Sequence, residues 1–586
     1  MGNQLIFFKY TFLIILSFFW AVNVASAKNT TGEIKAKTAK ERTVKTKKKS
    51  DGKKKTKTKT NKKANKKNKE KKAKQSEKNK KLKPVPAKNY YFSSAAESKK
   101  KQGLPDSVLK VINKYKIPKE NLSIYIRDLN KFEPLIEHRA DKLRSPASTM
   151  KLLTTYAALK ELGPNYSWRT EVWMRGDFEN GVLKGDLILK GFGDPFMVYE
   201  NFWKLLRVLR DKGLHEIQGD VILDDSYFKL PKHDSAAFDG RPFKVYNAAS
   251  SSLMFNFQAT RFLFRPVDST TDKKKLKESK KQSSKTKTKD NKKSKKKKRA
   301  KKSSTKGSVK IIPYPDINGL TIDNQVKLTS GRCRKSHYRP KFSKDKKGKL
   351  TIKGTYAKRC KQQFILRAVS TPEDHVFNAF REIWGDLKGK HSGQFKLGKV
   401  IKGDERFHVY ASPTLGTLMR LINKWSNNVM TRQVFLSLGA RKYGAPATPE
   451  KAEKAVLAVL SENKINTAGI SIENGSGLSR SSRISARQMG HLLEAAYRDP
   501  FMPEFMASLA LPGVDGTLVN RFRKSDLRGR SHFKTGTLTG VSAIAGYMLN
   551  RKGKRLVIVI QHNGKKTGAG RSKKIQDALI RWSFEQ

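Results

Sequence analysis

Cysteine is almost absent from this chain of 586 residues, which contains only Cys333 and Cys360. Two cysteines are too few for a disulfide scaffold, and they lack the close pairing of metal ligands. The ten histidines form no HExxH motif and no other paired metal spacing, so scattered surface and core histidines are the simpler interpretation. Cys333 and Cys360 could form one disulfide or stay as free thiols, and the sequence leaves both alternatives open.

Acidic residues are also scarce, with 50 Asp and Glu against 126 Lys and Arg, which gives a formal net charge of +76. Residues 28–90 carry 27 basic and 5 acidic residues, and residues 271–310 carry 20 and 3, so these two stretches supply about half of the excess. Residues 28–90 contain almost no large apolar side chain and are predicted to be disordered. Residues 265–310 have the same composition inside an ordered region, which predicts a long surface loop.

Long hydrophobic runs are missing except near the N-terminus, where YTFLIILSFFWAV follows Lys9. The run has the length of a signal-peptide core, and Ala25-Ser26-Ala27 offers small residues for cleavage, so residues 1–27 are predicted to be a signal peptide. A retained membrane anchor is the alternative, but a span needs about 20 apolar residues. We therefore expect export to the periplasm or cell envelope.

Apolar periodicity elsewhere predicts a mixed α/β (α+β) protein. Residues 104–115 have helical spacing, residues 121–128 alternate as a strand, and MKLLTTYAALKEL forms a strong helical run ended by Gly163-Pro164. The sequence then becomes rich in short strands until about residue 405. From residue 408 it turns helical, with a break near Ser426, and it ends in strand, hairpin, strand and helix, a pattern that could close an antiparallel sheet covered by helices.

Three short motifs could carry chemistry. The first is Ser148-Thr149-Met150-Lys151, whose spacing places the hydroxyl and the amine on one face of a helix turn. Serine is a weak nucleophile unless a neighbour takes its proton, and lysine can do so when burial or a second cation lowers its pKa. The motif alone is weak evidence, because Ser284 to Lys287 in the lysine-rich loop fits it too, and helix capping is the alternative.

The second and third motifs are an SxN triplet, Ser426-Asn427-Asn428, and a KTG triplet, Lys534-Thr535-Gly536. The SxN triplet taken alone is better interpreted as a polar helix end. KTG occurs twice, but residues 534–536 directly precede a predicted strand, whereas residues 566–568 lie in a glycine-rich connection. The first copy is therefore the candidate for a site, and the second copy is predicted to be a turn.

In the order SxxK, SxN, KTG, these motifs form the signature of penicillin-binding proteins and serine β-lactamases. Longer stretches, including SPASTMKLLTTYAAL, NGSGLSR, LPGVDGTLVNR and HFKTGTLTGVSAIAGY, resemble the D-alanyl-D-alanine carboxypeptidase/endopeptidase family of the penicillin-binding protein 4 type. The resemblance implies a β-lactamase/DD-peptidase-like catalytic domain formed by residues 91–170 and 406–586. Residues 171–405 would be strand-rich inserted domains, which a compact β-lactamase does not accommodate between its first two motifs. NGSGLSR itself is predicted to be a turn beside the site rather than a direct catalytic element.

The resemblance also implies roles for the motif residues. Ser148 would attack the carbonyl of the penultimate D-alanine in a peptidoglycan stem peptide or cross-link, with Lys151 as general base. Ser426 would relay a proton to the leaving amine, and Asn428 would hold the substrate's peptide group. No metal or organic cofactor is implied.

On the KTG strand, Lys534 would keep Lys151 deprotonated and attract the substrate's C-terminal carboxylate. Thr535 and Thr537 would hydrogen-bond this carboxylate, with Gly536 between them. The backbone N–H groups of Ser148 and Thr537 would form the oxyanion hole. Water would hydrolyse the acyl-enzyme, and β-lactams would acylate the same serine and leave slowly.

Other functional classes remain as alternatives. Within the resemblance, these are a catalytically silent peptidoglycan-binding protein, a β-lactamase-like hydrolase and a transpeptidase. A nucleic-acid-binding protein would also be lysine-rich, but export and the lack of interleaved aromatic residues in the tails argue against it. We instead expect the lysine-rich segments to bind anionic envelope polymers or membrane surfaces. The oligomeric state is not predictable from the sequence.

Overall fold

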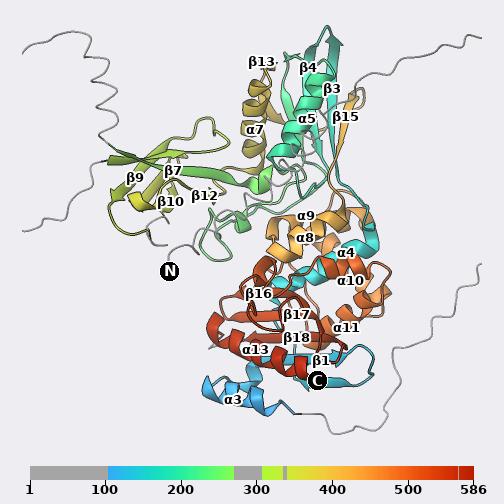
Figure 1. The fold of residues 1–586 in the computed structure, drawn as a ribbon. Helices are drawn as coiled ribbons and strands as arrows, with labels where there is room; N and C mark the ends of the chain where they lie inside the picture. The colour runs from blue at the N-terminus through green and yellow to red at the C-terminus, as the bar shows by residue number, and fades with distance from the viewer. Residues whose placement is uncertain (1–102, 269–306, 334–339, 565–566) are drawn as a thin grey trace, which may run out of the picture. The chain divides into compact units, whose positions relative to one another are not determined.

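The computed structural model describes residues 103–268, 307–333, 340–564 and 567–586 (Figure 1). The predicted signal peptide, the extension at residues 28–90 and most of the lysine-rich loop lie outside these ranges. The predicted loop boundaries at residues 265 and 310 are too wide. Strands β7 (Thr260–Asp268) and β8 (Gly307–Ile312) pair up to Asp268 and Gly307, because Phe264 and Val309 are buried in a core that extends into the lysine-rich sequence.

A five-stranded antiparallel sheet joins the two ends of the described chain. Its order is β16 (Ser531–Leu538), β17 (Val541–Leu549), β18 (Arg555–Asn563), β1 (Leu122–Asp128) and β2 (Pro134–His138). Strand β1 pairs with β18 in continuous register from Leu122–His562 to Asp128–Leu556. The sheet therefore depends on sequence separated by more than 400 residues, and it leaves β16 at one edge.

Alternating side chains of this sheet enter two different cores. Ile124 and Ile126 pack with helices α3 (Asp106–Lys114) and α13 (Ala569–Glu585), whereas Tyr125 points to the opposite core. The period of two in an extended strand produces this division. Both faces of the sheet are thus covered by helices (Figure 1), which confirms the predicted fold class.

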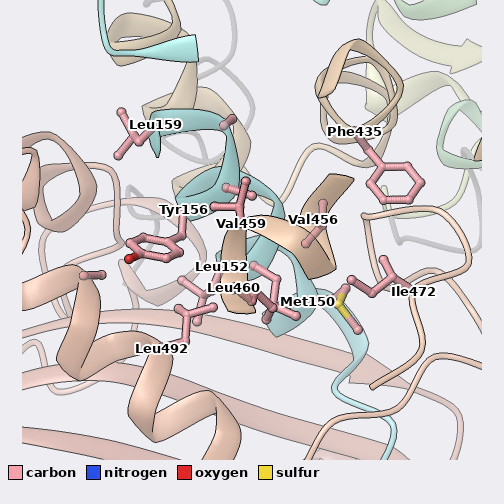
Figure 2. Close-up of a cluster of buried hydrophobic side chains, with 14 of the residues drawn as sticks. Met150, Leu152, Tyr156, Leu159, Phe435, Val456, Val459, Leu460, Ile472 and Leu492 are labelled. Atoms are coloured by element: carbon pink, nitrogen blue, oxygen red, sulfur yellow. The ribbon is translucent and has the colours of Figure 1, made fainter. Parts of the chain in front are cut away.

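The central helix of the second core is α4 (Lys151–Leu162), in which residues 151–159 are all buried. A helix that is apolar on every side needs neighbours on every side. Figure 2 shows Leu152, Tyr156 and Leu159 of this helix among side chains from α9 (Asn428–Tyr443), α10 (Pro449–Glu462) and α11 (Ala486–Tyr497). This packing holds the start of α4 in place. The same layer contains α8 (Leu415–Trp425) and α12 (Met502–Ala507).

The strand-rich segment forms separate sheets. A seven-stranded sheet contains β3 (Arg169–Glu179), β4 (Val182–Gly191), β5 (Glu216–Ile217), β6 (Val221–Asp224), β13 (Lys390–His391), β14 (Phe395–Leu397) and β15 (Glu405–Ala411). Its core includes α5 (Tyr199–Asp211) and α7 (Pro372–Asp386). Two three-stranded sheets follow, composed of β7, β8 and β12 (Gln363–Arg367), and of β9 (Ile322–Thr329), β10 (Lys341–Lys344) and β11 (Leu350–Ala357).

The chain enters and leaves this region through neighbouring strands, because β3 pairs with β15 up to Arg169 and Ala411. We keep the division into residues 91–170, 171–405 and 406–586 as a prediction. Cys333 and Cys360 are joined in a disulfide, with Cys360 at the end of β11 and packed in the core of the small sheets. Among the described residues, no helix is long and apolar enough to cross a membrane.

Candidate active site

Ser148 lies in a short 3-10 turn, Ala147–Met150, and Lys151 is the first residue of α4. The two residues were predicted to share one turn of a single α-helix, whereas the structure tightens the turn just before the helix. The tightening begins at Ala147, which has a left-handed φ of 47° and is fully buried. Lys151 Nζ nevertheless lies 3.2 Å from Ser148 Oγ.

The Lys151 amine is fully buried and has three polar neighbours. It donates to Asn428 Oδ1 at 2.6 Å and to the backbone oxygen of Ser476 at 2.6 Å. Burial lowers the pKa of Lys151 well below its ordinary value, and the positive charges of Lys534 and Arg432 lower it further. A neutral amine has two N–H groups and one lone pair. In the neutral form, Asn428 Oδ1 and the Ser476 carbonyl would accept both N–H groups, and the lone pair would be left to accept from the Ser148 hydroxyl.

The SxN motif occupies the predicted helix break. Helix α8 ends at Trp425, and Ser426 adopts the left-handed conformation with φ 59°. Asn427 then caps α9, because its Oδ1 accepts from the backbone N–H of Met430 at 3.1 Å. Asn428 is the first residue of α9. The break therefore places Ser426 against Lys534 and Asn428 against Lys151.

The KTG motif lies on β16, the edge strand of the five-stranded sheet. Lys534 is fully buried, and its Nζ donates to Ser426 Oγ and to the carbonyl of Thr535, both at 2.9 Å. Burial lowers the pKa of Lys534 to about 7. Thr535 Oγ1 lies 2.9 Å from Thr517 Oγ1, and Thr537 is exposed.

Gly536 brings this edge strand against the serine turn. A Cβ at this position would lie 2.6 Å from the Pro146 oxygen and 2.9 Å from the Ser148 nitrogen. Only a residue without a side chain allows such an approach. The motif's third residue therefore has a steric function, because it lets the serine turn and the edge strand come together.

The second KTG copy does not form part of this arrangement. Lys566 lies outside the described residues, while Thr567 and Gly568 directly precede α13, with Gly568 as its N-terminal cap residue. Thr567 Oγ1 donates to the Gly564 carbonyl at 2.9 Å. These contacts are those of a local turn.

Sequence reasoning did not identify three contributors to this site: the backbone carbonyl of Ser476, the side chain of Thr517 and the guanidinium of Arg432. The Ser476 carbonyl lies in NGSGLSR, which was predicted to be a turn beside the site. Gly477 in this loop has a φ of 73°, and its lack of a side chain lets the loop approach the Ala147 carbonyl. A backbone carbonyl has no side-chain signature. The repeated glycines were a sequence signal for the loop. No sequence signal pointed to Arg432, because an arginine in a helical segment resembles an ordinary surface charge.

Among the described residues, no group of three or more His, Cys, Asp or Glu side chains could hold a metal ion. The arrangement places a serine hydroxyl beside a buried amine whose pKa is lowered. A second buried lysine and the edge of a sheet complete the constellation. It can support proton abstraction from Ser148 and attack on a carbonyl.

Comparisons with known proteins agree with this chemistry. The family model for the D-Ala-D-Ala carboxypeptidase 3 (S13) family matches residues 104–586. The chain is similar to D-alanyl-D-alanine carboxypeptidase DacB of Haemophilus influenzae, at 23% identity over 80% of this chain and 90% of that protein. It is 27% identical to a D-alanyl-D-alanine carboxypeptidase of Actinomadura sp. (strain R39), over 74% of this chain and 76% of that protein.

The fold is similar to the crystal structure of penicillin binding protein 4 (dacB) from Haemophilus influenzae, complexed with a novel β-lactam. The TM-score is 0.63 at 20% identity, and the match covers 82% of this chain and all of the other, at 100%.

Proposed function

Because the chain belongs to the D-Ala-D-Ala carboxypeptidase 3 (S13) family, we propose that it is a serine DD-peptidase whose nucleophile is Ser148. One observation supports this proposal above the others: a fully buried Lys151 has both N–H groups occupied and lies 3.2 Å from the Ser148 hydroxyl. A lysine held neutral in this way acts as a general base.

In the proposed acylation step, Lys151 takes the proton of Ser148 while Oγ forms a bond to the carbonyl carbon of the penultimate D-alanine. The peptide C–N bond then breaks, and a proton passes through Ser426 to the amine of the leaving D-alanine. Water attacks the resulting ester and releases Ser148. Asn428 donates to the substrate's peptide carbonyl through its amide N–H₂ while its Oδ1 stays on Lys151.

Lys534 provides the positive charge for the substrate's terminal carboxylate. Burial lowers its pKa to about 7, and a bound carboxylate would raise this pKa by Coulomb attraction. Substrate binding would thereby increase the charge on Lys534 and disfavour protonation of Lys151 at the moment when the base is needed. Thr535 and Thr537 hydrogen-bond the same carboxylate.

The developing oxyanion lies between the backbone N–H groups of Ser148 and Thr537 in this proposal. Gly536 supports it, because the close approach of β16 brings the two backbone segments together. Pre-oriented N–H donors of this kind contribute about 3 to 4 kcal/mol to transition-state stabilisation. β-Lactams would acylate Ser148 by the same route.

The test is acylation by a labelled penicillin, together with mass analysis of products from defined muropeptide monomers and dimers. We expect a stable penicillin adduct and release of D-alanine, and Ser148→Ala should abolish both. Ser583→Ala is the control, because this serine is buried on α13 and belongs to none of the three motifs. An adduct on the Ser148→Ala protein would show that the nucleophile is a different residue.

The same products separate the alternatives within this function. Release of D-alanine from monomers indicates a carboxypeptidase, and cleavage of dimers into monomers indicates a DD-endopeptidase. A catalytically silent peptidoglycan-binding protein would retain muropeptides without cleaving them. Rapid turnover of penicillin with no muropeptide cleavage would indicate a β-lactamase-like hydrolase.

We also propose export through the signal peptide at residues 1–27 and electrostatic binding of the lysine-rich segments to anionic envelope polymers. Their charge, 27 basic against 5 acidic residues in residues 28–90, supports the second proposal. Deletion of residues 28–90 should release the exported protein from isolated envelopes at low salt. Unchanged retention after the deletion would exclude this segment as a tether.

A further inference from the structure

Arg432 is a basic side chain close to the catalytic groups that no motif accounts for. It lies on α9, four residues after Asn428, so the two side chains project from the same side of this helix. Arg432 is only partly accessible, and its Nε atom is shielded from solvent without a hydrogen-bond partner. Among the described residues, no carboxylate forms an ion pair with it.

The guanidinium holds a segment of the strand-rich region against α9. Its Nη2 donates to the backbone oxygens of Tyr246 at 3.1 Å and Ala248 at 2.8 Å. The nearby carboxylate of Asp239 is occupied by this segment, because it accepts from the Tyr246 hydroxyl at 2.7 Å and from the Asn247 amide at 2.8 Å. These neutral carbonyls satisfy the Nη2 donors of Arg432 but leave its positive charge uncancelled.

From this geometry we infer that Arg432 is a positioning residue of the active site: it clamps residues 246–248 onto α9 and holds an uncancelled positive charge one helical turn from Asn428, the hydrogen-bond partner of Lys151. This inference rests on the proposed function of Lys151 as the base. Arg432 thus acts through Lys151 and does not itself contact the reacting atoms.

The charges around Lys151 agree with this role. Lys534 on β16 and Arg432 on α9 are the two charged groups that act on the amine, and both lower its pKa after burial. Carboxylates on neighbouring elements are engaged elsewhere. Glu473 accepts from the Ser479 and Ser481 hydroxyls, Glu453 on α10 accepts from the Ile472 N–H, and Asp515 pairs with Lys424 on α8.

Arg432 keeps its positive charge over a wider pH range than Lys534 does. Burial lowers the pKa of Arg432 only to about 10, whereas it lowers that of Lys534 to about 7. Before substrate binds, Lys534 is therefore partly neutral near pH 7, while Arg432 stays charged. The arginine would act on Lys151 in the free enzyme, and Lys534 would add its full effect when a carboxylate is bound.

The experiment measures the second-order rate of acylation by a labelled penicillin from about pH 5 to about pH 9. This interval includes the range of about pH 5 to 8 in which most proteins are most stable. The acid limb of this profile reports protonation of Lys151 in the free enzyme. Arg432→Gln and Arg432→Met remove the charge, and Arg432→Lys keeps it. We expect the charge-free variants to move the acid limb upward by about one pH unit and Arg432→Lys to leave it within a few tenths of a unit.

Arg521→Gln is the matched control. Arg521 is a buried arginine whose charge is cancelled by Asp577 at 2.6 Å. This variant should lose stability and keep the wild-type acid limb. Two charge-free variants are included so that a folded one is available, with folding checked by a thermal melt.

An unchanged acid limb in the folded charge-free variants would overturn the inference, and so would an equal shift in Arg432→Lys, because either result makes the residue purely structural. Neither outcome affects the proposed function, since the wild-type protein would still be acylated at Ser148. Absence of acylation in the wild type would instead refute the proposed function itself.

Discussion

Two buried lysines, Lys151 and Lys534, lie at the centre of the site, and neither pairs with a carboxylate among the described residues. An ammonium group that leaves water without a counter-ion lowers stability, so the group tends to become neutral instead. This tendency lowers the pKa of Lys151, and in the proposed function the neutral amine is the form that acts as the base. The residue-level chemistry of the site therefore comes from the same burial that destabilises the fold.

Replacement of Lys534 by Met should separate these two effects. The pKa of Lys534 falls from its ordinary 10.5 to about 7 on folding, so the unfolded chain binds more protons between these values. The wild-type free energy of unfolding should rise as pH increases from about 7 toward 10. Lys534→Met should flatten this rise and stabilise the protein at pH 7 by about 1 to 3 kcal/mol, with acylation lost.

Urea unfolding at several pH values measures the effect of Lys534→Met, and Lys110→Met provides the control because Lys110 is exposed on α3. A Lys534→Met protein that is less stable than wild type at pH 7 would contradict the prediction, and so would one that is acylated normally.

Gly536→Ala tests the close approach of β16 to the serine turn. The new methyl group would lie 2.6 Å from the Pro146 oxygen and 2.9 Å from the Ser148 nitrogen, so the turn or the strand must shift. A displacement of about 1 Å at a reacting group costs on the order of 100-fold in rate. Acylation by penicillin should fall by that order, whereas Gly385→Ala, where the methyl group meets nothing within 4 Å, should leave the rate unchanged. Equal rates for both variants would mean that the turn tolerates the methyl group.

At the scale of elements, the break between α8 and α9 decides where the two polar side chains of the SxN motif, Ser426 and Asn428, lie. A continuous helix from Leu415 to Tyr443 would direct Ser426 and Asn428 to different sides, since each residue advances the helix by about 100°. The left-handed Ser426 and the cap at Asn427 end one helix and start the next. Ser426 then contacts Lys534, and Asn428 contacts Lys151.

Two helix caps on this layer provide a matched comparison. Asn427→Ala and Thr448→Ala each remove a side chain that accepts from a backbone N–H, at 3.1 Å in α9 and 3.3 Å in α10. Each should lower the free energy of unfolding by about 1 kcal/mol. Only Asn427→Ala should also slow acylation, because the first turn of α9 holds Asn428. Parallel denaturation and acylation measurements check this, and equal rates for the two variants would contradict it.

Most elements of the catalytic part were predictable because their apolar periods are strong. Residues 104–115 and 121–128 show this most clearly, and the helix break at Ser426 was visible as a polar triplet between two apolar runs. The details that differ are local. The SxxK serine lies in a 3-10 turn because the serine turn must accommodate Gly536 and Gly477 from other segments.

At the scale of the whole molecule, the five-stranded sheet unites β1 and β2 with the last three strands, and the strand-rich region branches off through the paired strands β3 and β15. Because entry and exit are adjacent, the inserted sheets need not distort the catalytic sheet. Arg432 is one point where the two regions are joined by hydrogen bonds. Stability and activity should accordingly be separable for changes made far inside the inserted sheets.

The disulfide offers a test of that separation. Cys333 and Cys360 close a segment of 27 residues, and loss of such a cross-link should lower the free energy of unfolding of the inserted sheets by about 3 kcal/mol. The double variant Cys333→Ser, Cys360→Ser should therefore unfold at a lower temperature. Its acylation rate should match wild type, because the hydrogen bonds of Lys151 and Lys534 involve no residue of these sheets. A slower rate in the folded variant would show coupling between the inserted sheets and the site.

The sequence by itself determined the chemistry that the protein can carry. The three motifs, their order and the strong apolar periods around them can be identified directly in the sequence, because each motif or period consists of residues close together in the chain. The tertiary structure alone decided the electrostatics and the close approaches, because the pKa of Lys151 is lowered only where Asn428, Ser476, Lys534 and Arg432 meet from distant segments. The burial of a side chain and the electrostatic potential around it depend on all segments that pack there, so they cannot be predicted from any single segment.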